Sequence, residues 1–306
     1  MSNFSSSGTA MDGQEDPVSG EISPQGLLVA FLAIVAEAVA ARLLELGVAD
    51  QLLISGCRAF IQLSLLGVIL HPIFTASNPG IVLGYIFGFM ILVSAYEAAA
   101  RPKVTYPGIF RNAVLSLGGS LLVAGVVLLI IVAPSPWYNA QYLIPLAGML
   151  INNSLSGVAL ALNEMIDHLT THKEYVSVLL AFGATPWEAA WPGFVRSAQK
   201  ALIPAINGMN VIGLVTIPGM MTGQILGGAS PVKAARYQIV ITFLISACSF
   251  MSVGFICLLT IRECFDHEGR HDLACMVKQS RLKIAQWSLP PSIRRCLLAP
   301  LRCLRP

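Results

Sequence analysis

Charged residues are scarce in this chain. Only 11% of its 306 residues are Asp, Glu, Lys or Arg, whereas 55% are hydrophobic, and the mean hydropathy is +0.72. A soluble domain carries about 25% charged residues. The composition therefore excludes an ordinary soluble globular protein, and we expect lipid to solvate most of the chain.

A nucleotide-binding loop is also missing. No lysine is followed by Ser or Thr, so the G-x-x-x-x-G-K-[ST] phosphate loop does not occur. The chain therefore cannot hydrolyse ATP by that route, and we expect it to be no enzyme and to bind no cofactor, with any ATP bound by a partner subunit. If ATP drives its activity, a separate ATPase chain must bind and hydrolyse it. We expect membrane lipid, and no nucleic acid, among the partners.

Long apolar runs fill most of the sequence. Each comes close to the roughly 20 residues that a helix needs to cross a bilayer, which predicts an all-α, multi-pass membrane protein with seven spans. The predicted spans lie near Gly26–Leu46, Leu52–Leu70, Ile81–Ala99, Ala113–Ala133, Tyr142–Leu162, Ile206–Leu226 and Ile239–Ile261.

Basic residues alternate between the loops. Residues 1–25 are acidic and contain no Lys or Arg, whereas basic residues gather after Ile261. Because Lys and Arg concentrate on the cytoplasmic side, the N-terminus is predicted outside and the C-terminus in the cytoplasm. The chain then divides into an acidic tail (1–25), a membrane domain (26–262) with a cytoplasmic loop (163–205), and a basic, cysteine-rich tail (263–306). Whether the membrane is the plasma membrane or an internal one stays open.

The stretch from Val211 to Gly228 combines features of a transport pathway. Its glycines at 219, 223 and 227 are four apart, a spacing that lets helices approach closely in lipid. Pro218 removes a helical hydrogen bond, which a membrane tolerates beside protein or water. We interpret this stretch as a kinked helix beside the pathway, although its methionines could instead fill gaps in packing. The candidate pathway residues, here and in other spans, are Glu37, Arg58, Gln62, Asn152, Asn153, Pro218, Met220, Met221 and Gln224. We expect the asparagines, with Asn207 and Asn210, to face the bundle interior.

A charged pair is predicted between the first two spans. The short turn near Gly47–Gln51 makes these spans an antiparallel hairpin, in which Glu37 and Arg58 differ in depth by about 4–5 Å. Because a charge inside a bilayer is costly, we predict that the two side chains pair. Alternatively, Arg58 faces a hydrated cavity or lipid phosphates.

The loop between the fifth and sixth spans carries the second signal. Gly183 can end one helix, while Thr185, Pro186 and Glu188 form the start of another, with a capping box. The pattern predicts a short amphipathic helix between two breaks. An ordinary amphipathic loop on the membrane surface is the alternative. The residues of interest are Leu180, Gly183, Ala184, Thr185, Pro186 and Glu188.

These signals together resemble one family. The runs Leu180–Ala190, Arg58–Leu63 and Pro218–Gly223 look like those of the seven-span permeases of the bacterial iron-export ABC system and the plant aluminium-sensitive proteins. The resemblance covers about residues 26–262. It implies a homodimeric permease that pairs with an ATPase through the cytoplasmic loop, and that exports a metal ion or confers metal tolerance. Nucleotide-sugar transport, proposed for the plant relatives, is an alternative, as is an ATPase-independent secondary transporter or a membrane scaffold.

The C-terminal tail contains a protease-like motif. Residues 267–271 match H-E-x-x-H, but Gly269 weakens the helix that the motif needs, and no enclosing domain follows. A milder hypothesis is a soft-metal site, because four ligand-type residues share one helical face. A solvated helix with incidental His and Cys is the favoured alternative. The four residues are Cys264, His267, His271 and Cys275.

Overall fold

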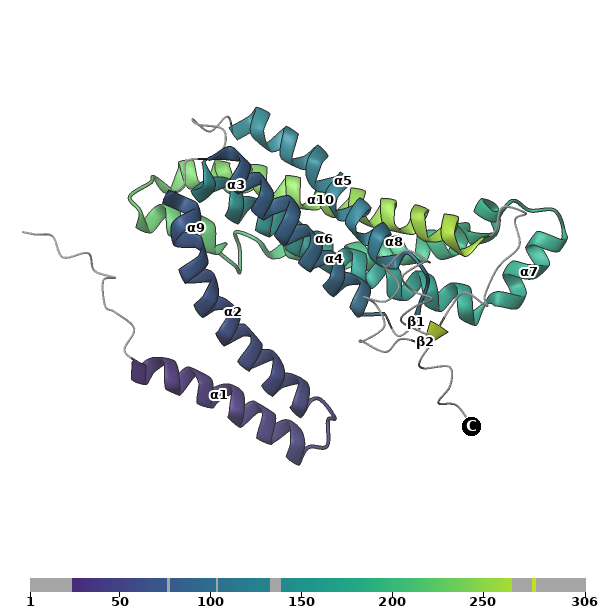
Figure 1. Cartoon of the computed structure of the whole chain (residues 1–306), viewed down its shortest axis with the longest axis horizontal. Coiled ribbons are helices and arrows are strands. Elements are labelled where there is room, and N and C mark those ends of the chain that lie inside the picture. Colours follow the sequence, from purple (N-terminus) through teal and green to yellow (C-terminus); the bar gives the residue numbers. More distant parts are fainter. Residues whose placement is uncertain (1–23, 76–77, 103, 133–138, 266–276, 279–306) are drawn as a thin grey trace, which may run out of the picture. The chain divides into compact units, whose positions relative to one another are not determined.

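The computed structural model describes residues 24–75, 78–102, 104–132, 139–265 and 277–278, and helices dominate them (Figure 1). The chain divides into two compact units, residues 1–72 and 73–306. Most of the first unit is an antiparallel pair of helices. The second unit contains a bundle of long helices that run alongside one another.

The first unit confirms the predicted hairpin. Helices α1 (Pro24–Leu43) and α2 (Ala49–Thr75) are joined by a turn in which Gly47 has a φ of +69°. The rings of Phe31 and Phe60 meet edge to face with centroids 6.4 Å apart. The side chain of Ile34 also lies against Gly56, where a β-carbon would have almost no room.

The second unit begins with three consecutive helical segments, α3, η1 and α4, followed by the longer helices. Segment η1 is a π-helix, and Val104 and Thr105 of β1 pair antiparallel with Lys278 and Val277 of β2. The elements are α3 (Pro79–Gly84), η1 (Tyr85–Met90), α4 (Ile91–Ala100), β1 (Val104–Thr105), α5 (Ile109–Val132), α6 (Ala140–Thr171), α7 (Lys173–Ala181), α8 (Pro186–Val211), α9 (Gly219–Leu226), α10 (Pro231–Cys264) and β2 (Val277–Lys278).

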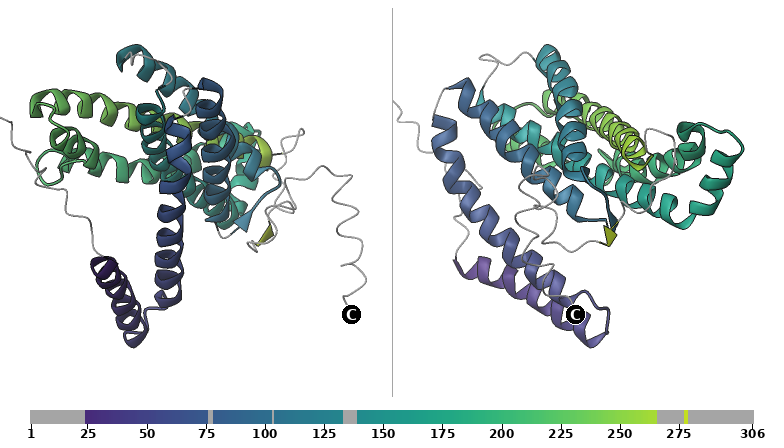
Figure 2. Two further views of the ribbon diagram at one scale, coloured as in Figure 1. Left: turned by 60° about the vertical axis from the view of Figure 1, so that its left-hand side comes forward. Right: turned by 45° about the vertical axis from the view of Figure 1, so that its right-hand side comes forward.

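The core of the second unit lies where α6 packs against α8, α10 and α5 (Figure 2). Small residues allow these helices to approach closely. A β-carbon on Gly157 of α6 would lie 3.1 Å from the Val253 side chain of α10. On α8, the buried side is made of Ala189, Ala190, Gly193, Ser197 and Ala201. Helix α8 thus packs through small side chains, whereas α6 buries large ones such as Leu162 and Met165 beside Gly157.

Six helical stretches among the described residues are long and apolar enough to cross a membrane: 25–43, 49–74, 79–100, 109–132, 140–171 and 231–264. They correspond to six of the seven predicted spans. The predicted span Ile206–Leu226 is wrong as a single kinked helix. The chain leaves α8 after Val211, Gly213 takes a φ of +80°, and Pro218 is the N-cap of α9. Because proline cannot donate a backbone hydrogen bond, the helix restarts there instead of bending.

The predicted short helix after Gly183 is also wrong in its length. Helix α8 begins where expected but continues for 26 residues, with Pro192 and Pro204 inside it. Each proline removes one helical hydrogen bond. The freed carbonyls belong to Glu188 and Lys200, which are exposed and can be solvated, while the small side of the helix stays packed. Tertiary packing therefore overrides the helix-breaking signal.

The close contact at Gly193 gives a test of this packing. A β-carbon there would lie 2.7 Å from Nδ1 of buried His168. Gly193→Ala should therefore overpack the contact between α6 and α8 and lower the free energy of unfolding by about 1–3 kcal/mol. Gly208, in the same helix, has nothing within 4 Å of that position. Gly208→Ala should therefore raise the free energy of unfolding by most of the ~1 kcal/mol by which alanine is more favourable than glycine inside a helix. Thermal unfolding of the solubilised protein measures both, and equal stability of the two variants would contradict the packing.

Candidate functional site

The turn between α7 and α8 forms one end of the bundle. The amide of Gly183 donates to the Leu180 carbonyl (3.0 Å) and that of Ala184 to the Leu179 carbonyl (3.1 Å). Gly183 has a φ of +90°, a conformation that side chains disfavour. These bonds are the usual glycine-terminated end of a helix. The prediction that Gly183 ends one helix is confirmed.

The predicted capping box begins α8. The amide of Glu188 donates to the Thr185 hydroxyl oxygen (3.3 Å), and the amide and hydroxyl of Thr185 each donate to the Glu188 carboxylate (2.8 Å). These bonds, the backbone one first, hold the pKa of Glu188 below its ordinary value. Pro186 occupies the first helical position. The start of α8 is therefore fixed by local bonds on an exposed turn.

Aromatic side chains are exposed beside this turn. Phe182 is 85% exposed, and the rings of Trp187, Trp191 and Phe194 contact one another with centroids 5.2–5.5 Å apart. Behind them, Leu179 and Leu180 of α7 pack on a buried cluster that includes Ile261 near the end of α10. We call residues 179–194 the tip. Its apolar base anchors it to α6 and α10, and its outer side offers an exposed aromatic surface.

A cluster of charges lies between α6 and α8 near the tip. The carboxylate of Glu164 meets Nε of Arg196 at 2.8 Å and Nζ of Lys200 at 2.6 Å. Glu164 is mostly covered, whereas about half of each cationic side chain is exposed. One carboxylate thus faces two cations, which leaves one net positive charge. Nearby, the ring of His168 in α6 lies 4.9 Å from that of His172, the residue that follows α6.

A row of polar residues continues from this cluster along α6 and α8. We call it the polar stripe. Its side chains are exposed, apart from the partly covered Glu164, and point away from the core of the second unit. The expectation that the asparagines face the interior is therefore wrong for this chain taken alone. Helix packing buries the opposite sides of α6 and α8, where α6 carries mainly apolar residues and α8 carries small ones. The stripe consists of Asn152, Asn153, Asn163 and Glu164 on α6 and of Arg196, Lys200, Asn207 and Asn210 on α8.

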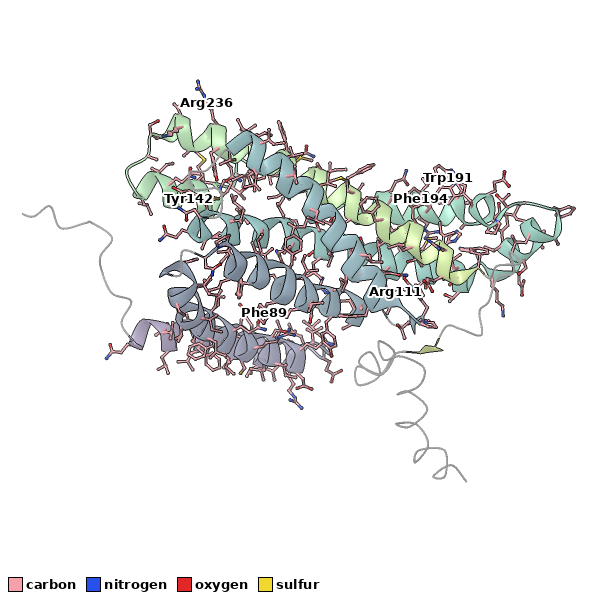
Figure 3. The ribbon with its side chains drawn as sticks, turned by 45° about the horizontal axis from the view of Figure 1, so that its top comes forward. Phe89, Arg111, Tyr142, Trp191, Phe194 and Arg236 are labelled. Atoms are coloured by element: carbon pink, nitrogen blue, oxygen red, sulfur yellow. The ribbon has the colours of Figure 1, made fainter. Side chains whose placement is uncertain are left out.

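The stretch from Val211 to Gly228, with its proline and glycines, lies at the other end of the bundle from the tip. Helix α9 follows the end of α8 and packs on α10. Figure 3 shows Tyr142 and Arg236 at this end and Trp191, Phe194 and Arg111 at the opposite one. None of the α9 residues is buried. Pro218, Met220, Met221 and Gln224 are half-buried, so the structure gathers them at one end rather than in the middle of a span.

The candidates in the first unit lie on the hairpin. Glu37, Arg58 and Gln62 are all exposed within it. The pairing of Glu37 with Arg58 stays a prediction. An ion pair of Arg42 with Asp50, at 3.5 Å, lies at the turn of the hairpin.

The metal candidates of the tail fall mostly outside the described residues. His267, His271 and Cys275 are among those not described. Cys264 is buried at the end of α10, in the cluster under the tip. Across the described ranges, no group of three or more His, Cys, Asp and Glu side chains is placed to hold a metal ion. The soft-metal site stays a prediction.

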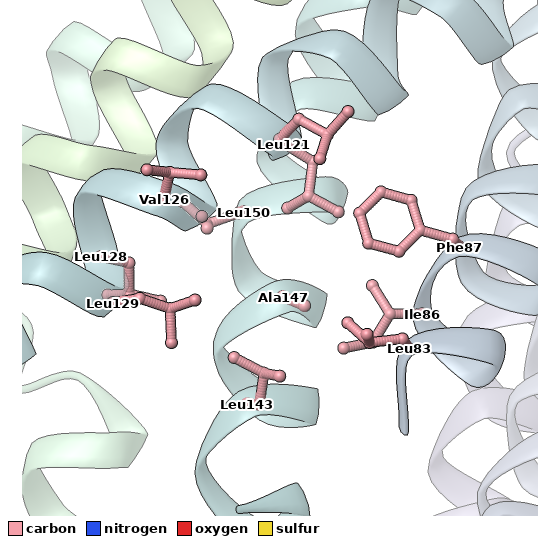
Figure 4. A pocket seen from close by; sticks show the side chains of 12 residues that line it. Leu83, Ile86, Phe87, Leu121, Val126, Leu128, Leu129, Leu143, Ala147 and Leu150 are labelled. Atoms are coloured by element: carbon pink, nitrogen blue, oxygen red, sulfur yellow. The ribbon is translucent and has the colours of Figure 1, made fainter. Parts of the chain in front are cut away.

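An apolar pocket lies between η1, α5 and α6 (Figure 4). It encloses about 130 Å³, and hydrocarbon side chains such as Phe87, Leu121 and Leu143 line it. The π-helical turn at Tyr85–Met90 borders the pocket. None of the described residues that line it carries a group capable of acid–base chemistry.

Comparisons with known proteins decide the family. The family described as Uncharacterised protein family (UPF0014) matches residues 24–265. The chain belongs to this family. It is 35% identical to a UPF0014 membrane protein of Synechocystis, over 72% of this chain and 85% of the relative. It is 32% identical to the Protein ALUMINUM SENSITIVE 3 of Arabidopsis thaliana, over 73% of this chain and 80% of the relative. It is 30% identical to the Probable iron export permease protein FetB of Escherichia coli, over 83% of this chain and 96% of the relative.

The UPF0014 match confirms the resemblance drawn from the motifs. The chain is a multi-pass integral membrane protein, and one of its relatives is named a probable iron export permease. No solved structure matches it.

Sequence reasoning missed two parts of the site. The ion cluster of Glu164, Arg196 and Lys200 carries a signal, because Arg196 and Lys200 are four apart on one helix face, but their carboxylate partner lies on another helix. The aromatic contacts of Trp187, Trp191 and Phe194 also follow from spacings of three and four. Both become visible only once residues 186–211 are recognised as a single helix.

The capping box gives a test of the tip. Thr185→Ala should lower the local stability of the first turn of α8 by about 1 kcal/mol. The equilibrium constant for local opening of that turn should then rise about 5-fold. Ser177→Ala is the matched control, since that hydroxyl donates only to the Lys173 carbonyl inside α7. Hydrogen exchange of residues 185–189 measures the opening.

The same bonds predict a pH dependence. The folded-state pKa of Glu188 is lowered. The stability that its ionised carboxylate gives to the first turn of α8 is therefore fully present above the ordinary glutamate pKa of about 4.3. It should be lost as the pH falls through the lowered pKa. Local opening, corrected for the intrinsic exchange rate, should therefore increase in acid in the native protein but not in Glu188→Gln. Identical profiles would contradict the assigned bonds.

Proposed function

We propose that this chain is the permease subunit of an ABC transporter that works with a separate ATPase chain, and that the complex exports a metal ion or otherwise confers metal tolerance. The observation that carries the proposal is the tip, a rigid, exposed turn with a fixed helix start. The names of two relatives, an iron export permease protein and an aluminium-sensitivity protein, support the cargo class.

The tip has the properties that a docking element for an ATPase needs. An element that transmits motion must be rigid, and the capping box and the glycine turn fix both sides of the tip. It must also offer apolar area, and Phe182, Trp187 and Trp191 are exposed there. Aromatic anchors with a small polar rim are typical of binding surfaces. The ATPase would bind and hydrolyse ATP, and this chain would bind none.

We infer seven crossings, in which α8 takes the place of the predicted sixth span. Helix α8 runs beside α6 and α10 and, at about 1.5 Å per residue over 26 residues, is roughly 39 Å long. With the N-terminus outside and the C-terminus in the cytoplasm, the tip lies on the cytoplasmic side, where an ATPase can reach it. Helix α9 and the loop before it then lie at the outer side.

A secondary transporter or a membrane scaffold would need no ATPase. The tip is the feature that distinguishes these alternatives, because neither gives a reason for its fixed and exposed aromatic surface. Nucleotide-sugar transport by the same complex would leave the docking element unchanged and differ only in the cargo.

Docking is tested with variants of the tip. Native membranes are labelled with a photoreactive azido-ATP, and the gently solubilised permease is then captured. A labelled chain should be retained with the native permease and lost with Gly183→Leu, which cannot hold a φ of +90°, and with Glu188→Lys, which breaks the capping box. The purified complex should likewise lose cargo-stimulated ATP hydrolysis.

Lys233→Ala serves as the control, because Lys233 lies at the start of α10, at the opposite end of the bundle. It should retain the labelled chain. The proposed ATPase contact is refuted if every variant retains the labelled chain. It is also refuted if no permease, the native one included, retains it. The cargo class is tested separately by comparing the iron and aluminium tolerance of cells with and without the protein. Unchanged tolerance to both metals refutes that part.

A further inference from the structure

Two histidines lie side by side at the end of α6. The amide of His172 donates to the carbonyl of His168 at 3.0 Å, so the helical turn continues to His172, the C-cap residue. Residues four apart on a helix are neighbours on its surface, and the two ring centres lie 4.9 Å apart. The end of α6 therefore presents two imidazoles, the commonest metal ligands in proteins, on one side.

The distance between the rings is that of a chelate. A metal ion about 2.1 Å from one nitrogen of each imidazole, with tetrahedral angles, holds the two ring centres about 5 Å apart. Helical histidines at this spacing bind zinc together in metalloproteases. Because the rings of His168 and His172 already lie at this distance, both can bind one ion without a large movement of either.

One of the rings is held in place by packing. His168 is 9% exposed, and its Nδ1 lies against Gly193 of the tip, where a β-carbon would be 2.7 Å away. That nitrogen has no hydrogen-bond partner in the described part of the chain. Burial without a partner favours the neutral imidazole, which is the form that binds metals, and leaves Nε2 as the ligand atom. His172 is exposed, so it can reach the ion from the solvent side.

The charges around His168 do not repel a cation. Apart from the neighbouring histidine, the charged groups that act on it are those of Arg196, Glu164 and Asp167. Glu164 is bound to two cations of α8, and Asp167 is exposed beside the pair. The two carboxylates thus balance the two cations, and the pair itself adds no charge while both rings are neutral.

We propose that His168 and His172 form a binding site for a divalent transition-metal ion of the Fe²⁺ and Zn²⁺ class. Imidazole suits these ions, whereas hard cations such as Al³⁺ take oxygen ligands. The described residues supply no third ligand of the His, Cys, Asp or Glu type, so water fills the other coordination positions. A site with two protein ligands binds an ion and releases it again, as a transport step requires.

The position of the site gives it a place in transport. His168 lies six residues beyond Leu162, where the predicted span ends, which is about 9 Å along the helix. With the orientation and cargo of the proposed function, on which this step alone rests, the site lies on the cytoplasmic side, where an exporter collects its cargo. The two histidines are then a loading site beside the tip, and they favour an iron-like ion over aluminium as the cargo.

Metal binding by the purified full-length permease tests the site. In Zn²⁺ titration calorimetry, His172→Gln should weaken binding about 100-fold, because the second histidine otherwise binds within the same molecule. His172 is exposed, so this change leaves the packing of α6 intact, and His168→Gln should give the same loss. The matched control is His267→Gln/His271→Gln, which removes the other pair of histidines four apart and should retain this binding.

A spectroscopic measurement separates a ligand from a merely structural residue. With Cu²⁺ as the probe, at less than one ion per chain, electron paramagnetic resonance of the His267→Gln/His271→Gln variant should show two imidazole nitrogens, and one after His172→Gln. His172→Cys should recover much of the Zn²⁺ affinity, because a thiolate also binds this ion. Fewer than two nitrogens before that change, or Zn²⁺ binding that only the tail variant loses, overturns the proposal.

The site and the proposed function fail in different ways. In cells, His172→Gln should lower iron tolerance toward that of cells without the protein and leave aluminium tolerance unchanged. If the purified protein binds the ion at these histidines but cellular iron tolerance does not depend on the protein, the site stands and the proposed iron-like cargo is refuted. If the purified protein shows no such binding, the site is refuted, whereas the labelling test of the ATPase contact is unaffected.

Discussion

The close packing of α6 against α8 and α10 is the contact on which the rest of the described structure depends. Glycine, alanine and serine at Gly157, Gly193 and Ser197 allow backbones to approach where larger side chains would not fit. This packing sets the register of α6 and α8, and the register brings Glu164 to Arg196 and Lys200. Because apolar residues take the inner side of α6 and small residues that of α8, the amides have to face outward. The polar stripe is a consequence of the packing.

Local features of the fold could be predicted from the sequence. The capping box needs only Thr185, Pro186 and Glu188, and the helix end needs only Gly183, so neighbouring residues decide both. The hairpin of α1 and α2 likewise follows from two apolar runs and a short turn. The boundaries of the long helices differ from the prediction by several residues, chiefly because α6 and α10 continue beyond the apolar runs.

Features that depend on distant contacts could not be predicted. Pro192 and Pro204 favour breaks in α8, yet packing against α6 and α10 keeps the helix continuous. Conversely, the run from Val211 to Gly228 is apolar enough to span, but Gly213 and Pro218 interrupt it. The direction in which Asn152 and Asn153 point was also not available from the sequence. Their polarity shows that lipid is an unsuitable neighbour, but the neighbouring helices decide which way they face.

The continuity of α8 has a mechanical consequence for the proposed coupling to an ATPase. A short docking helix followed by a separate span would need a joint between them, and motion would be lost in that joint. Here a single helix extends from the capping box at Thr185 to Val211, with Arg196, Lys200, Asn207 and Asn210 along it. Under the proposed function, a displacement of the tip would move the helix that carries these polar side chains. The loop at 212–218 would absorb the change, because Gly213 and Pro218 interrupt the chain between α8 and α9. The helix that would receive the motion also carries part of the stripe, so the proposed coupling needs no further element to connect the two ends.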